Sequence, residues 1–123
     1  MPCASKVVRE QLALLCRRGR SRRVALNLPC DWHPMTVYNQ RTGMPFTEGE
    51  AFEAIADALL DATIEVTVVT LRIPPGKTAY ELLIPQPRGC ARGCAPIYAK
   101  VQLGSGQVLA RSFHYSDYAE RRP

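Results

Sequence analysis

The stretch at residues 97–118, IYAKVQLGSGQVLARSFHYSDY, decides the fold. Two runs typical of β-strands flank Gly104-Ser105-Gly106-Gln107, and a Ser-Gly pair can supply the positive φ angles that tight hairpin turns need. We therefore predict a β-hairpin that turns at Ser105 and Gly106. The register that follows pairs Leu103 with Val108, Val101 with Ala110, Ala99 with Ser112 and Ile97 with His114.

Strand side chains alternate between the two faces of a sheet, so this register also predicts the two faces of the hairpin. One face is apolar, with Ser112 and His114 at its end. The other face carries Tyr98, Lys100, Gln102, Leu109, Arg111, Phe113 and Tyr115.

On that second face the register places Lys100 directly opposite Arg111. Like charges directly opposite each other destabilise a sheet, and a phosphate bound between them would relieve the repulsion. The aromatic rings of Tyr98, Phe113 and Tyr115 are expected around this pair, and cations interleaved with rings are typical of single-stranded nucleic acid binding. The alternative is that both cations splay apart into water.

The length, charge and cysteine content of the chain restrict the classes of protein to which it can belong. The chain has 123 residues, enough for one domain, and carries 16 Lys and Arg against 11 Asp and Glu, a formal net charge of +5. A basic domain favours nucleic acid, an acidic partner or a membrane surface. The sequence has no apolar run of the roughly 18 residues that cross a bilayer, and charged residues interrupt any leader-like segment. Five scattered cysteines suit reduced thiols, so we expect a cytoplasmic protein.

The N-terminal part is predicted to be a helix over residues 5–18, with Ser5 as its N-cap. A run of cations follows, which either contacts phosphates without sequence preference or is a solvated connector. As nucleic-acid-binding residues we name Arg17, Arg18, Arg20, Arg22 and Arg23, together with Tyr98.

A second helix is predicted over residues 48–60, because Thr47 and Glu50 form a capping box ahead of an apolar stripe. Strands are predicted at 24–29, 63–71 and 78–84, before the hairpin, and 30–43 is predicted to be loop. The fold class is α+β, with helices packed on one face of a small antiparallel sheet. We expect a single domain over 1–123, made of a basic helix and connector at 1–23 and an α+β core at 47–116.

Four residues are candidates for metal binding. Cys90 and Cys94 match the spacing of a structural zinc pair loosely, and Cys30 with His33 matches it less well. We expect no metal and no cofactor. A small phage or mobile-element protein stabilised by zinc stays open as an alternative.

The strongest candidate chemistry lies in the last strand. His114, near Lys100, Arg111 and Tyr115, could support metal-free RNA cleavage, because His can move a proton near neutral pH and the cations can stabilise the charged phosphate. The predicted alternation places His114 opposite to Arg111, unless a bulge re-aims it. The alternative is a core-edge histidine bonded to a backbone carbonyl.

The order of a capped helix, two strands, IYAKVQL, a tight turn and VLARSFHYS resembles the RelE-like ribonuclease toxins of toxin–antitoxin systems, and most of all their motility quorum-sensing regulator branch (MqsR). The resemblance covers residues 47–116. His114 stands where that branch has Lys, the loop holding Cys90 and Cys94 is an insertion, and the first 45 residues have no counterpart.

The resemblance implies metal-independent endoribonuclease action on mRNA, neutralised by an antitoxin protein. Lys100 and Arg111 match the basic residues of such toxins by position, and His114 and Tyr115 match the acid/base neighbourhood approximately. We therefore expect a toxin-type endoribonuclease with RNA as its partner. The alternative from another class is a non-catalytic module that binds nucleic acid or a protein partner through the same face.

Overall fold

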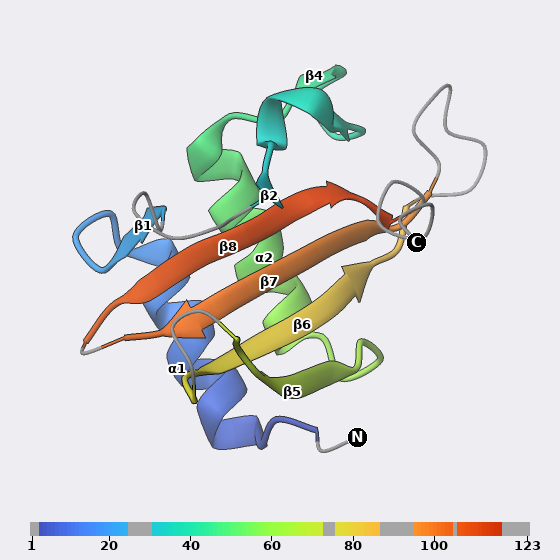
Figure 1. The fold of residues 1–123 in the computed structure, drawn as a ribbon. Coiled ribbons are helices and arrows are strands. Elements are labelled where there is room, and N and C mark those ends of the chain that lie inside the picture. Colours follow the sequence, from blue (N-terminus) through green and yellow to red (C-terminus); the bar gives the residue numbers. More distant parts are fainter. Residues whose placement is uncertain (1–2, 25–30, 73–75, 87–94, 105, 117–123) are drawn as a thin grey trace.

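The structure is a computed structural model that describes residues 3–24, 31–72, 76–86, 95–104 and 106–116. The described residues form an α+β fold with two α-helices, a mixed six-stranded sheet and a two-stranded sheet. Figure 1 shows both helices on the same side of the large sheet, behind its strands. The predicted fold class is therefore confirmed in its coarse form, and the likeness to RelE-type toxins stays a prediction.

Both helices begin where the sequence predicts. Helix α1 (Lys6–Arg17) has Ser5 as its N-cap, whose Oγ accepts a hydrogen bond of 3.2 Å from the Val8 amide. Helix α2 (Glu48–Leu60) has the complete capping box: the Glu50 amide donates to Thr47 Oγ1 at 3.1 Å, and the Thr47 amide donates to Glu50 Oε1 at 2.9 Å. These local bonds satisfy amides that have no partner inside the helix.

The large sheet has the strand order β1-β8-β7-β6-β5, and β2 pairs with β8 as well. Its strands are β1 (Arg22–Val24), β2 (Asp31–Trp32), β5 (Val66–Thr70), β6 (Thr78–Ile84), β7 (Ile97–Leu103) and β8 (Val108–Tyr115). Strands β5 to β8 are antiparallel neighbours, as predicted, but β1 and β2 run parallel to β8. The prediction of a wholly antiparallel sheet was wrong on this point.

The segment predicted as loop contains short regular elements. After β2 come η1 (Pro34–Thr36) and the small sheet formed by β3 (Tyr38–Asn39) and β4 (Met44–Pro45). The strand predicted at 24–29 begins earlier, at Arg22, and positions 25–30 lie outside the described residues. Two of the arginines assigned to a connector are thus part of a sheet edge.

The core lies between the helices and the sheet. Phe113 of β8 and Phe52 of α2 are fully buried there, and both contact the ring of Trp32, at centroid distances of 5.6 Å and 5.1 Å. Phe46 meets Phe113 edge-on at 5.1 Å. Burial of these rings ties β8 to the helix layer.

The hairpin register agrees with the prediction only near the turn. Leu103 pairs with Val108 and Val101 with Ala110, as predicted. A bulge follows between Lys100 and Val101, which leaves Arg111 as an extra residue on β8. The remaining pairs are Lys100–Ser112, Ala99–Phe113, Tyr98–His114 and Ile97–Tyr115, so the predicted pairs Lys100–Arg111, Ala99–Ser112 and Ile97–His114 were wrong.

The bulge exchanges the faces of the residues that follow it. Phe113 was predicted beside Lys100 and instead lies in the core. His114 was predicted on the apolar face and instead lies beside Tyr98, with ring centroids 5.3 Å apart. One extra residue shifts a period-two pattern by one step, and this accounts for the whole difference.

Among the described residues, neither α1 nor α2 is long and apolar enough to cross a membrane. The cytoplasmic location stays a prediction.

Candidate functional site

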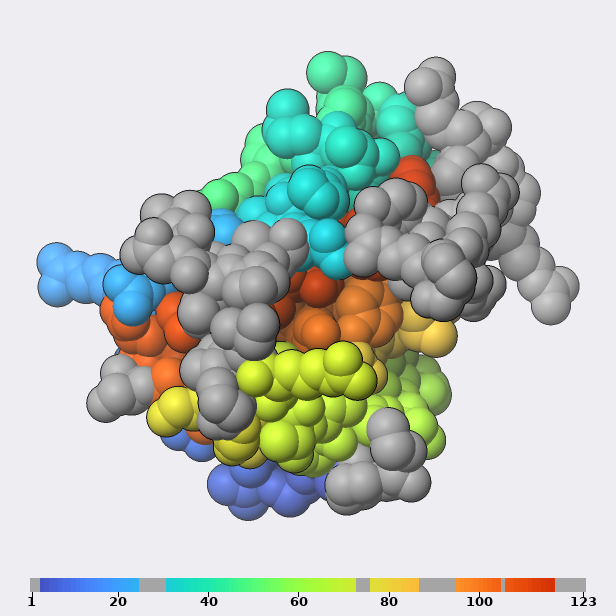
Figure 2. All heavy atoms as spheres, in the orientation of Figure 1, coloured from blue at the N-terminus to red at the C-terminus, as the bar shows by residue number. Residues whose placement is uncertain are grey.

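Polar and charged side chains gather on the side of the sheet that faces away from the helices, which we call the outer face. In each strand these polar residues alternate with core residues, and the strand pairing aligns the polar residues across β2, β6, β7 and β8. The outer-face cluster consists of Asp31, Glu81, Tyr98, Lys100, Gln102, Arg111, Ser112 and His114. Figure 2 views this side, and atoms of β7 and β8 (orange and red) reach the surface near its centre.

Lys100 and Arg111 share the outer face, although they are not a directly opposed pair. Half-buried Lys100 lies between Glu81 of β6 and Ser112 of β8 in the register. Arg111 is only 4 % exposed, and its Nη1 donates to Gln102 Oε1 at 3.4 Å. Each cation therefore has a polar residue of its own chain beside it, and the directly opposed pair from which a bound phosphate was predicted is absent.

Tyr98 links the acidic and the aromatic parts of the cluster. Its hydroxyl donates a hydrogen bond to Glu81 Oε2, and its ring lies against that of His114. Burial, followed by the bond to Glu81 and the negative charges of Glu81 and Asp31, raises the pKa of Tyr98 well above its usual value. Tyr98 is therefore a hydrogen-bond donor at neutral pH, with no capacity to act as a base.

His114 is placed by the bulge, and its surroundings resemble those of a structural histidine. Its side chain is 4 % exposed, and Nδ1 lies 2.9 Å from the carbonyl oxygen of Tyr115. This is the arrangement of the alternative in which the histidine bonds a backbone carbonyl. The His114 ring nevertheless lies on the same face as Lys100 and Arg111. Proton transfer at a phosphate bound by these cations requires this placement.

Tyr115 is the predicted site residue that the structure separates from the others. It pairs with Ile97 and packs against the core side of the sheet, and its hydroxyl accepts a 2.8 Å hydrogen bond from the Tyr38 amide. The structure therefore separates Tyr115 from His114, because neighbours along a strand point to opposite faces, and the catalytic role of Tyr115 stays a prediction.

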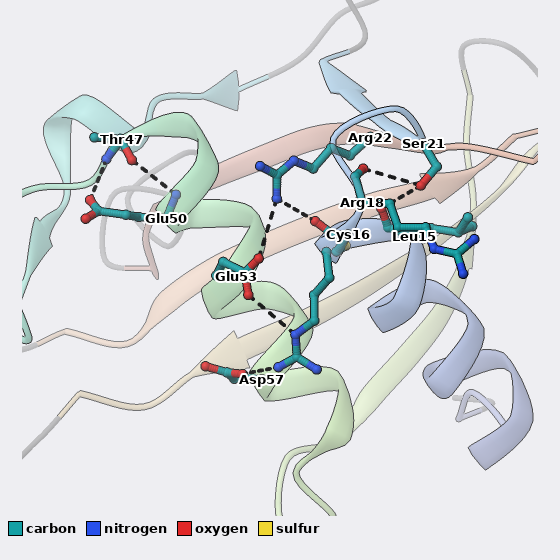
Figure 3. Close-up of polar contacts among 10 residues, drawn as sticks. Leu15, Cys16, Arg18, Ser21, Arg22, Thr47, Glu50, Glu53 and Asp57 are labelled. Carbon is teal, nitrogen blue, oxygen red and sulfur yellow. Dashed lines mark hydrogen bonds and ion pairs between the residues drawn. The ribbon is translucent and has the colours of Figure 1, made fainter.

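Two of the five arginines predicted to bind nucleic acid form side-chain contacts within the molecule (Figure 3). Arg17 forms ion pairs with Glu53 and Asp57 of α2. Arg22 Nη1 donates to the Cys16 carbonyl oxygen at 2.7 Å and lies 3.7 Å from Glu53 Oε2, with its guanidinium 5.3 Å from the centroid of the Phe52 ring. These two cations hold α1 and β1 against α2, which is a structural role.

The other three arginines of that run, Arg18, Arg20 and Arg23, are exposed. Arg23 pairs with Leu109, which places it on the outer face at the β1 edge, whereas its neighbour Arg22 points to the helices. Among the predicted nucleic-acid-binding arginines, Arg23 is therefore the one positioned beside the outer-face cluster.

Sequence reasoning missed the two acids of the cluster. Glu81 had a usable signal, because it is the polar residue between Tyr80 and Leu82 in a strand with an apolar face. Asp31 had none, since it reaches the outer face only through the parallel pairing of β2 with β8.

No group of His, Cys, Asp or Glu among the described residues could hold a metal ion. Cys30, Cys90 and Cys94 of the zinc alternative lie outside those residues, and His33 is exposed at the start of η1. The zinc-stabilised alternative therefore stays a prediction.

A groove of about 720 Å³ runs beside α2 on the helix side. Its carboxylates already have roles: Glu50 in the capping box, Glu53 and Asp57 with Arg17, and Asp61 with Thr63. This groove holds none of the predicted catalytic residues.

Comparisons of the chain with protein-family models, with curated proteins and with solved structures find no match.

Proposed function

We propose that the chain binds single-stranded RNA on the outer face of its sheet. The observation that supports this most is the bulge at Arg111, because it collects Lys100, Arg111, His114 and Tyr98 on one face. Arg23 extends the positive charge of that face to the β1 edge. Cations beside an aromatic ring match the sequence-tolerant mode in which phosphates bind the cations and bases stack on rings.

The electrostatics of the face predict modest rather than tight binding. Asp31 and Glu81 lie among the cations, and Arg111 is buried, so in the part of the outer face that the structure describes the cations within reach of phosphates are Lys100 and Arg23. Two phosphate contacts on a single strand give a slope of about −1.4 in log K against log salt.

The test is fluorescence anisotropy of a labelled single-stranded RNA, with EDTA present, over a series of salt concentrations. Lys100→Ala and Arg23→Ala are each expected to weaken binding and to reduce the salt slope by about 0.7. Lys6→Ala is the matched control, because Lys6 is an exposed cation at the first turn of α1, on the helix side. Unchanged binding in both outer-face variants, or an equal loss in the control, would refute the proposal.

Metal-independent RNA cleavage at the same face is the second candidate, and the specific observation in its favour is the placement of His114. In this reaction the 2′-hydroxyl loses its proton and attacks phosphorus, the bond to the 5′-oxygen breaks, and that oxygen gains a proton, which leaves a 2′,3′-cyclic phosphate. His114 is the group that would move the proton, and Lys100 and Arg111 would stabilise the phosphate charge. Because Arg111 and His114 are each 4 % exposed, the outer face must open before RNA reaches them.

Cleavage is tested with RNA in EDTA, by following the 2′,3′-cyclic ends. His114→Ala is expected to abolish cleavage with binding retained, whereas Tyr115→Phe, on the other face, is expected to leave it unchanged. His33→Ala is the histidine control, since His33 is exposed outside the cluster. If the RNA stays intact under all conditions but binds saturably, the cleavage candidate is rejected and only the binding role remains.

A toxin role with an antitoxin partner is the biological form of the second candidate. It predicts growth arrest when the chain is expressed, and relief by co-expression of the protein encoded beside it. Growth arrest that persists in His114→Ala would separate toxicity from cleavage, and harmless expression would count against the toxin role.

A further inference from the structure

A second cavity opens where β5 begins and β6 ends, at the side of the outer-face cluster. Its volume is about 530 Å³, within the range of small-ligand sites. The side chains that matter here are the outer-face residues Thr67, Glu81, Leu83 and Tyr98, and Glu65 at the rim. The cavity thus combines a carboxylate, an aromatic ring and an exposed leucine.

We propose that this cavity is a guanine-binding subsite, in which Glu81 accepts hydrogen bonds from the Watson–Crick edge of one guanine of the bound RNA. The inference rests on the RNA binding proposed above and adds the chemical identity of one base. Single-stranded RNA is recognised through such edges, because its bases are free to turn out of a stack.

The geometry of Glu81 supports this assignment. Tyr98 donates to Oε2, which fixes the carboxylate at the side of the ring and uses one of its roughly four acceptor positions. Guanine presents two neighbouring donors, N1–H and the N2 amine, which match the two oxygens of a carboxylate. The other bases place an acceptor next to each donor on the same edge, so they cannot satisfy both oxygens.

The neighbours of Glu81 make a bound nucleotide feasible. Lys100 lies directly opposite Glu81 on β7, so the repulsion between the carboxylate and the RNA phosphates is offset by an adjacent cation. The Tyr98 ring and the half-exposed Leu83 side chain provide apolar surface for the base.

Glu65 lines the same cavity and provides the matched control. It is exposed, whereas Glu81 is half-buried and held by Tyr98. A change of Glu to Gln removes the same charge at either position, but only Glu81 has a fixed orientation toward a base.

The experiment measures the affinity of the full chain for three labelled hexanucleotides in fluorescence anisotropy: UUGUUU, the same RNA with inosine for guanosine, and UUAUUU. The guanosine RNA is expected to bind about tenfold more tightly than the adenosine RNA, as for one good bidentate contact. Inosine lacks the N2 amine and is expected to fall between them. Glu81→Gln is expected to remove the preference for guanosine while UUAUUU binding is retained. Glu65→Gln is expected to keep the preference for guanosine.

The two proposals fail in different ways. Binding of all three RNAs with equal affinity overturns the guanine subsite and leaves the RNA-binding proposal standing. A preference for guanosine that persists in Glu81→Gln, or that disappears in Glu65→Gln, overturns the subsite as well. An equal gain in affinity for all three RNAs in Glu81→Gln also overturns it, because Glu81 would then act only as a charge that repels RNA. Absence of binding to any of the RNAs by a chain with native near-UV circular dichroism overturns both.

Discussion

The ring of His114 lies 5.3 Å from the ring of Tyr98, and the two planes are inclined by 34°. The contact exists because the bulge at Arg111 turns His114 to the outer face, where it pairs with Tyr98 across the hairpin. Tyr98 in turn donates to Glu81 on the next strand. These three side chains connect β6, β7 and β8 on the outer face of the sheet.

The first prediction concerns the bond between Tyr98 and Glu81. Tyr98→Phe is expected to lower the free energy of unfolding by about 1–2 kcal/mol, since a hydrogen bond to a charged group is lost from a partly buried position. Urea denaturation measures the change. Glu81→Ala and the double variant complete a mutant cycle, and a coupling energy near zero would show that the bond contributes nothing.

The second prediction concerns the bulge. Deletion of Arg111 is expected to give a folded protein, because Ala110 and Ser112 would then be adjacent and already point to opposite faces of the sheet. Phe113 keeps its place in the core. Near-UV circular dichroism of the aromatic core and cooperative urea unfolding are the measurements.

Deletion of Leu109 is the control for this experiment. Without Leu109, a regular strand would turn Ala110 outward and Arg111 into the core, where a charge is costly, so this variant is expected to be unfolded. If both deletions unfold the chain equally, the bulge is not the element that sets the two faces.

The third prediction separates the engaged arginines from the exposed ones. Arg22→Ala is expected to lower the free energy of unfolding by about 1–2 kcal/mol, because it removes the bond to the Cys16 carbonyl at the end of α1 and the contact above Phe52. Arg20→Ala is expected to change it by less than about 0.5 kcal/mol, since Arg20 is exposed. Thermal and urea unfolding of the two variants provide the comparison, and equal effects would contradict the structural role of Arg22.

The fourth prediction concerns alkaline pH. Burial raises the pKa of the Cys16 thiol to about 12, whereas a thiol in the unfolded chain titrates near 8.5. Above about pH 8.5 the unfolded state therefore loses a proton that the folded state keeps. The free energy of unfolding falls with rising pH, by at most about 1.4 kcal/mol per pH unit for this group.

Cys16→Val tests the origin of this pH dependence, because it keeps an apolar side chain at a fully buried position and removes the ionisable group. The variant is expected to lose less stability than the parent chain between pH 8.5 and 10, measured by urea unfolding at fixed ionic strength. Tyr98, whose pKa is also raised, adds a further decline from about pH 10 in both proteins. Identical profiles would exclude Cys16 as the cause.

The candidate site was predictable in part. Lys100, Arg111, His114 and Tyr98 were named from their strands, and the structure places all four on one face. Their pairing was not predictable, because a bulge depends on how well Phe113 packs against Phe46 and other distant rings, and no pattern within the hairpin encodes that preference. Asp31 was beyond prediction for the same reason, since β2 is defined only by its contact with β8.

The sequence by itself determined the elements whose causes are local: the N-cap Ser5, the capping box of Thr47 and Glu50, and the hairpin turn near Gly106. These depend on bonds and backbone angles within a few residues. Only the tertiary structure decided which face of the sheet each residue after Ala110 occupies and which strands flank β8. The physical reason is that burying Phe113 against the helix layer stabilises the chain more than regular pairing does, so the core selected the register and the outer face followed from it.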